Sequence, residues 1–479
     1  MEGKIIKGYS PARLFAFLEE ITKIPRGSGN EEGIAAWLEN FARKRGLFCV
    51  RDSVNNVFIK CDATPGYENE PPVLLQGHTD MVCEKNADVD FDFEKDPIDI
   101  YVDENGFLRA RGTTLGADDG VAVAIMLTLL DGEAGEHPAL ECLFTVQEET
   151  GLDGAKAFDY SLINARRMIN LDSENDGEVI LGCAGGNFHK VTFELDRVDF
   201  EGTAIRLFVG GLMGGHSGDK INSGRANANK LLGRALLQMS SSCQLHLVSI
   251  EGGNKDNAIP REASAVVSVS DVEAFEAALE EVSASLGGEL SAEDAGFYMK
   301  WENIDAPEKM ADKASTDKIL GFVSSIQNGV IAMSTNIKGL VEFSRNLGII
   351  ATKGDQVSLI FSARSAIESQ LDYAETELKS FASLLGGQTE SLGRYPGWEY
   401  AKVSPIRDKF SEVYRGLVGK APVENVIHAG LECGIIKSNI PDMDIISIGP
   451  GMRNIHSPDE ALDLASFEKI WKIVCGLLK

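Results

Sequence analysis

The sequence predicts an α/β domain, built on a mixed and largely parallel sheet flanked by helices, that is interrupted by an inserted α+β domain. Short apolar strands alternate with helical patterns in residues 1–186 and again in residues 396–479. Residues 187–395 instead carry longer, alternating strands, which are typical of a sheet with one solvated face. A chain of 479 residues also exceeds what a single core usually holds. We therefore expect one domain from 1–186 and 396–479, and a second from 187–395.

The first 186 residues contain strong helix and strand signals. Ser10 is expected to cap a helix whose first residue is Pro11, and a second helix should run from about Asn30 to Gly46. Further along, one helix and four buried strands are expected. The helix is Val121–Leu130, and the strands are Val57–Ile59, Val73–Leu75, Leu140–Val146 and Met168–Leu171.

The inserted region and the C-terminal segment continue this pattern. In the insertion we expect a strand at Ala265–Val269 and helices at Val272–Leu286 and Ile367–Leu385. Residues 258–286 and 357–385 both show a strand followed by a helix, which hints at an internal duplication. The C-terminal segment should contain the helices Ile406–Leu417 and Ser466–Leu478 and the strand Asp444–Ile448.

Composition excludes several classes of function. A net charge of −27 disfavours nucleic acid, because phosphates would be repelled. The longest apolar run, Val121–Leu130, is too short to span a membrane, and residues 1–4 open no hydrophobic signal segment. The eight cysteines form no CxxC pair and indicate buried thiols in a reducing compartment. We expect a cytoplasmic protein.

Histidines and carboxylates follow several of the predicted strands. His78 ends one strand and is followed by Asp80, a spacing that suits a metal-binding imidazole held by a carboxylate. Alone, such a tripeptide is more typical of an ordinary strand end. Others lie at comparable places, namely Asp118, Glu148, Glu149, Asp172 and His456. Ligands of open α/β sheets bind at the carboxyl ends of the strands, so these side chains are expected to converge there.

Two imidazoles and three carboxylates form a plausible site for two divalent cations. A mixed nitrogen and oxygen donor set favours Zn²⁺, with Mn²⁺ or Co²⁺ as alternatives. Asp118 is the expected bridging carboxylate. Glu148 and Glu149 are adjacent and point in different directions from extended backbone, so one can bind metal while the other stays free as a base.

Five motifs together resemble the M20 family of di-metal peptidases, and the resemblance extends over nearly the whole chain. They are Gly77-His78-Thr79-Asp80, Gly116-Ala117-Asp118-Asp119-Gly120, Glu148-Glu149-Thr150-Gly151, Asn170-Leu171-Asp172 and the late His456. Within that family, Gly214-Gly215-His216-Ser217-Gly218 and His456-Ser457-Pro458-Asp459-Glu460 are similar to segments of bacterial aminoacyl-histidine dipeptidases. The resemblance implies that the interrupted domain is catalytic and that the insertion is a lid.

The resemblance also implies a role for each residue of the expected metal site. His78 and Asp172 would hold one metal, Glu149 and His456 the other, and Asp118 would bridge them. Asp80 would orient His78, and Glu148 would be the general base. The peptide bond Asp118–Asp119 would be cis, and Asp119 stands where close relatives often have asparagine, which leaves its own role open.

Four residues of the expected lid are candidates for binding substrate. His216 would hold the scissile carbonyl oxygen or a substrate terminus, and Asn257 and Asn336 are further candidates. Arg364 could pair with a substrate carboxylate through two parallel hydrogen bonds, although an ordinary surface ion pair explains this arginine equally well.

The function that follows is hydrolysis of unblocked dipeptides, with Xaa-His substrates such as carnosine favoured, through a metal-activated water and a glutamate base. Another reaction of the same family, as in an aminoacylase, deacetylase or tripeptidase, is the first alternative. A non-catalytic binding protein on the same fold is the second, but it would be expected to have lost a ligand or the base. The resemblance also implies a homodimer formed through the lid.

Overall fold

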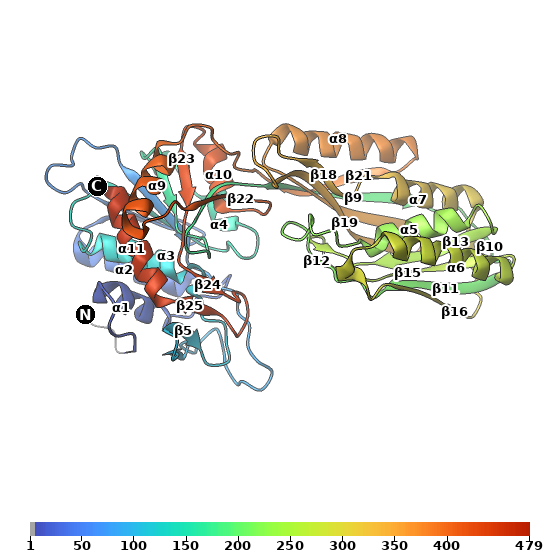
Figure 1. Cartoon of the computed structure of the whole chain (residues 1–479), viewed down its shortest axis with the longest axis horizontal. Helices are drawn as coiled ribbons and strands as arrows, with labels where there is room; N and C mark the ends of the chain where they lie inside the picture. The colour runs from blue at the N-terminus through green and yellow to red at the C-terminus, as the bar shows by residue number, and fades with distance from the viewer. Residues whose placement is uncertain (1–4) are drawn as a thin grey trace. The chain divides into compact units, whose positions relative to one another are not determined.

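The computed structural model describes residues 5–479, and the chain forms two compact units (Figure 1). Unit 1 comprises Met1–Gly182, Trp398–Val426 and Leu431–Lys479, and unit 2 comprises Cys183–Gly397 and Ile427–Gly430. The expected boundaries were 186/187 and 395/396. Residues 1–4, for which the sequence predicts no signal segment, lie outside the described residues. No described helix combines the length and apolar character needed to cross a bilayer.

Unit 1 is built on an eight-stranded mixed sheet in the order β1-β2-β6-β3-β7-β23-β8-β22. Its four central neighbours, β6, β3, β7 and β23, run parallel. The strands are β1 Phe48–Arg51, β2 Val57–Cys61, β3 Val73–His78, β6 Leu140–Thr145, β7 Arg167–Asn170, β8 Glu178–Cys183, β22 Val423–Ile427 and β23 Asp444–Ser447. A second sheet orders β24 Met452–Arg453, β25 Ala461–Asp463, β5 Phe107–Ala110 and β4 Ile100–Val102. The prediction of a mixed sheet with parallel members is confirmed.

The helices of unit 1 are α1 Ala12–Ile21, α2 Glu32–Arg45, α3 Ala117–Leu130, α4 Asp153–Ala157, α9 Pro405–Val418, α10 Glu432–Asn439 and α11 Leu464–Leu478, with a short 3-10 helix at Tyr160–Leu162. All residues of α3 are buried, which explains why this helix is apolar on every side. It packs against β3 and α1. The expected start of α1 is wrong by one residue. Pro11 has extended backbone and is the N-cap, with its carbonyl accepting from Leu14 N–H, so the helix begins at Ala12.

Unit 2 contains a nine-stranded sheet in which every described pair is antiparallel. The order is β16-β11-β15-β13-β19-β20-β9-β21, with β18 paired to β19. Its strands are β9 Gly185–Glu194, β11 Thr203–Gly210, β13 Leu245–Gly252, β15 Ala263–Val269, β16 Tyr298–Asn303, β18 Gly329–Met333, β19 Val341–Lys353, β20 Gln356–Ser365 and β21 Gln388–Tyr395. Two strand pairs lie outside it, β10 Arg197–Asp199 with β17 Lys309–Ala311, and β12 Gly215–His216 with β14 Ala258–Ile259.

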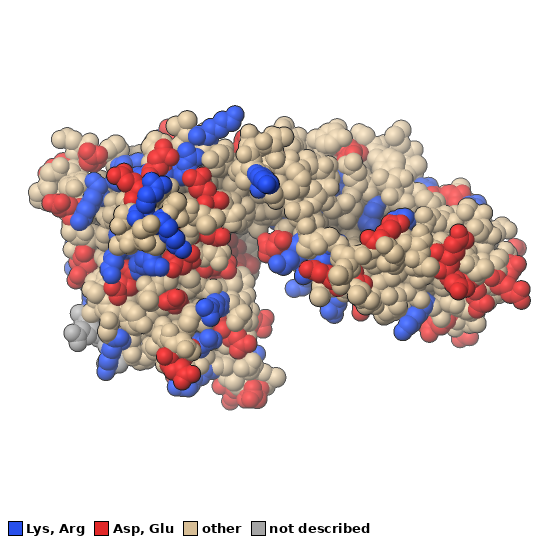
Figure 2. All heavy atoms as spheres, viewed as in Figure 1, with Lys and Arg blue, Asp and Glu red and all other residues tan. Residues whose placement is uncertain are grey.

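The helices of unit 2 share one large apolar core with its sheet. They are α5 Ala228–Met239, α6 Val272–Glu289, α7 Lys313–Ser325 and α8 Glu368–Leu384, with a 3-10 helix at Ala292–Asp294. The expected helices within the insertion correspond to α6 and α8. Acidic side chains gather at the end of this unit where α6 lies (Figure 2). The α+β character expected for the insertion is confirmed.

Residues Ile427–Gly430 belong to unit 2, although the prediction placed them with the outer domain. Ala184 N–H donates to the Ile427 carbonyl at 3.1 Å. The His428 Nε2 atom lies 2.7 Å from the Ser344 hydroxyl on β19. These contacts join four residues of the C-terminal segment to unit 2.

Candidate metal centre

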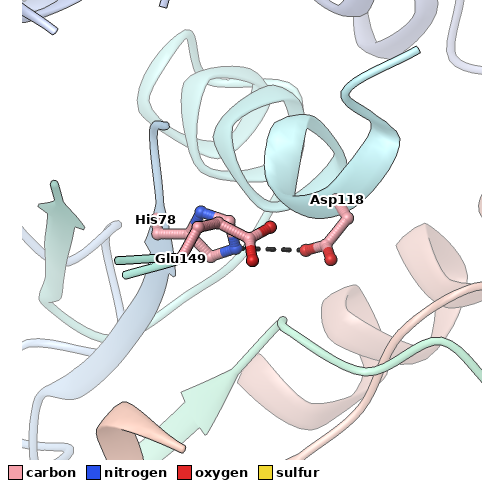
Figure 3. Close-up of side chains that lie close together, drawn as sticks. All are labelled: His78, Asp118 and Glu149. Carbon is pink, nitrogen blue, oxygen red and sulfur yellow. Dashed lines mark hydrogen bonds and ion pairs between the residues drawn. The ribbon is translucent and has the colours of Figure 1, made fainter. Parts of the chain in front are cut away.

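The predicted metal ligands converge in unit 1, beside the carboxyl ends of three parallel strands. His78 ends β3, and Asp118 lies in the first turn of α3. Glu149 follows β6, Asp172 follows β7, and His456 follows β24. Neighbouring parallel strands end at the same edge of a sheet, so short apolar runs far apart in sequence deliver their following residues to one place. In Figure 3, His78, Asp118 and Glu149 point toward one another.

Asp118 lies between the two histidines. Its Oδ1 is 3.1 Å from His78 Nε2, and its Oδ2 is 3.2 Å from His456 Nε2. His456 Nε2 is also 2.8 Å from Glu149 Oε1, and His78 Nε2 is 3.7 Å from Asp172 Oδ1. A carboxylate with one oxygen toward each imidazole has the arrangement of a ligand that bridges two cations.

The charges of this cluster also fit bound cations. Ligand atoms of His78, Asp118 and Glu149 lie within 4.8 Å of one another, as do those of His78, Asp119 and Asp172. Burial raises the pKa of Asp172, and the negative charges of Asp118 and Glu149 raise it further. Divalent cations would relieve this repulsion, and the nitrogen and oxygen donors suit zinc or a similar metal.

Asp80 holds His78 from the side away from Asp118. His78 Nδ1 is 3.1 Å from the Asp80 carbonyl oxygen and 3.3 Å from its Oδ1. The Asp80 carboxylate also accepts from Glu148 N–H at 3.1 Å and Glu149 N–H at 3.3 Å. Burial opposes its ionisation, but the His78 imidazole keeps the pKa of Asp80 below its usual value. Asp80 therefore orients the imidazole and also the backbone that carries the glutamate pair.

Glu148 and Asp119 are carboxyl groups in a desolvated setting. Burial raises the pKa of Glu148 well above its ordinary value, and the negative charge of Asp172 adds to this. A raised pKa suits a group that must accept and return a proton near neutral pH. The Asp118–Asp119 bond is cis, as the resemblance implies. Asp119 is wholly buried, which raises its pKa well above its ordinary value, and it accepts from His78 N–H and Ala122 N–H at 3.3 Å each.

Of the four predicted substrate residues, all in unit 2, three lie in a connected region. His216 Nδ1 accepts from Gly218 and Asp219 N–H at 3.3 Å each, and Ser217 N–H donates to the Asn257 carbonyl at 2.8 Å. Arg364, on β20, is 4% exposed. The His216 imidazole lowers the pKa of Asp219, and the positive charge of Arg364 contributes to this.

Arg364 also has hydrogen-bonding capacity left. Its Nη1 donates to the Tyr395 hydroxyl at 2.8 Å, whereas its buried Nε has no partner among the described residues. This geometry argues against an ordinary surface ion pair.

Asn336 lies on an exposed turn, where its N–H faces Ser334 Oγ at 3.3 Å.

His428 is a neutral imidazole in unit 2. Burial and the nearby charge of Arg364 lower the pKa of His428 to about 3. Its Nε2 lies 2.7 Å from the Ser344 hydroxyl, within hydrogen-bond distance. The sequence left the role of this histidine open, and the structure shows it anchoring the Ile427–Gly430 segment.

A buried polar chain behind the metal centre was not predicted. Glu432 Oε2 accepts from Gln76 Nε2 at 2.6 Å and from Thr145 Oγ1 at 2.7 Å. Gln76 Oε1 accepts from Asn170 Nδ2 at 2.7 Å, and Asn170 Oδ1 accepts from Asp172 N–H at 3.3 Å. A polar residue at a strand position where an apolar one is expected, as with Gln76, is the sequence signal for such a chain.

The chain is similar to known proteins over almost its whole length. The chain is 39% identical over 476 residues to the cytosol non-specific dipeptidase of Escherichia coli, covering 98% of each protein. It is 38% identical to the crystal structure of aminoacylhistidine dipeptidase from Vibrio alginolyticus, with a TM-score of 0.89, covering 98% of this chain and 96% of that one. The aminopeptidase PepT of Bacillus cereus, at 17% identity, a TM-score of 0.56 and 98% coverage of both chains, shares the fold. Residues 74–479 match the family described as peptidase family M20/M25/M40. By its motifs, its fold and these similarities, the chain belongs to peptidase family M20/M25/M40.

Proposed function

We propose that this protein is a metal-dependent dipeptidase that hydrolyses unblocked dipeptides and favours Xaa-His substrates such as carnosine. The observation that carries the proposal is the position of Asp118, with one carboxylate oxygen toward each of His78 and His456. The similar proteins support a dipeptidase, although their names imply different ranges of substrates. The Escherichia coli relative is named non-specific, whereas the Vibrio alginolyticus protein is named for aminoacylhistidine substrates.

The proposed cofactor is a pair of divalent cations, with zinc favoured over manganese or cobalt. His78 and Asp172 would hold one, Glu149 and His456 the other, and Asp118 both. When bound, the cations supply Lewis acidity toward the peptide carbonyl and the attacking water.

Protons move through Glu148 in this proposal. Its carboxylate accepts a proton from the water that attacks the peptide carbon, and it then donates that proton to the leaving amine nitrogen. Asp80 keeps the Nε2 face of His78 directed toward Asp118. Because Asp80 also binds Glu148 N–H, the base and the imidazole share one anchor.

The substrate carboxylate is assigned to Arg364. Its buried Nε has no hydrogen-bond partner among the described residues, so the guanidinium can donate to a substrate carboxylate. His216, Asn257 and Asn336 are proposed as further substrate contacts. The domain roles are also proposals: catalytic for residues 1–186 and 396–479, and lid and dimer contact for 187–395. A cytoplasmic homodimer acting on small peptides, without nucleic acid or membrane partners, completes the proposal.

A substrate panel with defined metal content tests this function. Carnosine, Xaa-His and Xaa-Ala dipeptides, tripeptides and N-acetyl amino acids would be incubated with protein carrying two equivalents of zinc. We expect dipeptides to be cleaved, Xaa-His fastest, with activity lost to a chelator and restored by zinc. Faster turnover of N-acetyl amino acids or tripeptides would favour the aminoacylase, deacetylase or tripeptidase alternatives. Metal binding with no turnover of any substrate would favour the binding protein.

A further inference from the structure

The Glu460 carboxylate accepts hydrogen bonds from four successive backbone N–H groups. Oε2 lies 2.7 Å from Leu115 N and 3.0 Å from Gly116 N. Oε1 lies 2.8 Å from Ala117 N and 3.4 Å from Asp118 N. The side chain is buried, and these groups lie more than 340 positions away in sequence.

This carboxylate fixes the backbone that carries Asp118. The four N–H groups precede and begin α3, whose N-cap, Gly116, offers no side-chain acceptor. Helix N-termini need such acceptors, and here the acceptor comes from the loop that carries His456. Glu460 thus connects the segments bearing two of the proposed ligands.

Arg26 binds the same loop through a backbone carbonyl group. Its guanidinium is buried, and its Nη1 donates to the Thr79 carbonyl at 2.9 Å and to the Asp80 carbonyl at 3.2 Å. Its Nη2 donates to the Gly116 carbonyl. The first two carbonyls follow His78 directly, so Arg26 joins the end of β3 to the loop that Glu460 holds.

We propose that Glu460 and Arg26 are positioning residues that hold the segments bearing His78, Asp118 and His456 at the spacing two cations require. The inference rests on the proposed metal centre. Ligands must be held within about 0.5 Å of their working positions, and none of these three segments is a neighbour of another in sequence. Glu460 and Arg26 supply fixed hydrogen bonds between these segments.

The variant Glu460→Gln tests the proposal with little change in size. One carboxylate oxygen becomes an NH₂ group, which faces two of the four N–H donors and cannot accept from them. We expect zinc affinity to fall roughly 10- to 100-fold, the range found when residues supporting metal ligands are changed. Arg26→Lys keeps the charge but loses the planar fork, and its zinc affinity should fall in the same direction.

Glu141→Gln is the matched control. Glu141 is also buried and accepts from Asn164 N–H at 3.0 Å and from Ala165 N–H at 3.0 Å, but that loop carries no proposed ligand. Its zinc affinity should equal that of the unaltered protein.

Zinc dissociation constants would be measured by competition with a chromophoric chelator, and Tm would be measured on the metal-free proteins. Weakened zinc binding by Glu460→Gln and Arg26→Lys, but not by Glu141→Gln, supports the proposal. Unchanged zinc affinity in Glu460→Gln, even with a lower metal-free Tm, would mean that Glu460 only caps α3, and it would overturn the proposal. Equal loss in Glu141→Gln would also overturn it. An unaltered protein that binds two zinc ions but cleaves no dipeptide would defeat the proposed function and leave this inference standing.

Discussion

Replacing Glu432 with glutamine should stabilise unit 1 near and above neutral pH, because the folded protein no longer has to bury an ionised carboxylate. The carboxyl group is fully buried at the start of α10, and Oε1 has no partner among the described residues. Burial raises the pKa of Glu432 from 4.5 to about 7, although the nearby charge of His78 opposes this. Glutamine keeps an oxygen that can accept from Gln76 and Thr145, so the fold should be retained.

The size of the cost follows from the two pKa values. Below pH 4.5 both the folded and the unfolded chains are protonated at Glu432, and the group costs nothing. Above a pH of about 7 the folded protein must bury the ionised form, while the unfolded chain exposes it to water. A difference of roughly 2.5 pKa units corresponds to about 3 kcal/mol, at about 1.4 kcal/mol per unit. Stability is therefore lost as the pH rises, and Glu432→Gln lacks this loss.

Hydrogen exchange of metal-free protein, read by mass spectrometry on peptides covering β3 and β6, gives the opening free energy of this region. The opening free energy of the variant should exceed that of the unaltered protein by a margin that grows by about 3 kcal/mol from about pH 4.5 to about pH 8. The measurement reports on unit 1 alone, which matters because a protein of two units need not unfold in one step. A difference between the two proteins that is the same at both pH values would refute the reasoning.

Three further predictions concern the proposed reaction. Glu148→Gln should lower kcat by roughly 10²- to 10⁴-fold while two zinc ions remain bound, as counted by elemental analysis; near-normal kcat would show that the base lies elsewhere. Arg364→Lys should raise KM for dipeptides by roughly 10- to 150-fold, from the loss of about 1.5–3 kcal/mol in charged hydrogen bonds, and dipeptide amides should be unaffected; an equal rise in KM for the amides would exclude the carboxylate role. Removing the metal should lower Tm, and zinc at about 100 times its Kd should restore about 2.7 kcal/mol of stability; a Tm insensitive to zinc would contradict the metal centre.

The placement of three proposed ligands could be predicted from sequence, because His78, Glu149 and Asp172 end or follow short apolar runs. His78 and Asp172 follow runs that become the parallel strands β3 and β7, and parallel strands end at one edge. The order of those strands could not be predicted, since β23 enters the sheet from the far end of the chain. The hint of duplication in the insertion likewise says nothing about the order of its nine strands.

The supporting groups escaped sequence analysis for a different reason. Glu460 and Arg26 bind backbone N–H and carbonyl groups, which every residue type except proline presents alike. Leu115 and Glu460 are 345 positions apart, so no local spacing links them. Pro11 shows a smaller failure: its residue type suits the first position of a helix, but its backbone is extended and the helix begins one residue later.

The place of β23 in the unit 1 sheet bears on how the protein is made. β7 and β8 are close in sequence, yet β23 lies between them and is synthesised only after all of residues 183–397. On the ribosome, unit 2 can fold from an almost continuous stretch of chain. Until β23 is synthesised, the sheet of unit 1 lacks the strand that lies between β7 and β8. Exposed strand edges of this kind attract other chains, so the nascent protein should depend on chaperones at that stage. The same strand precedes His456 and Glu460, so a chain that terminates before β23 lacks both that strand and one of the proposed ligands.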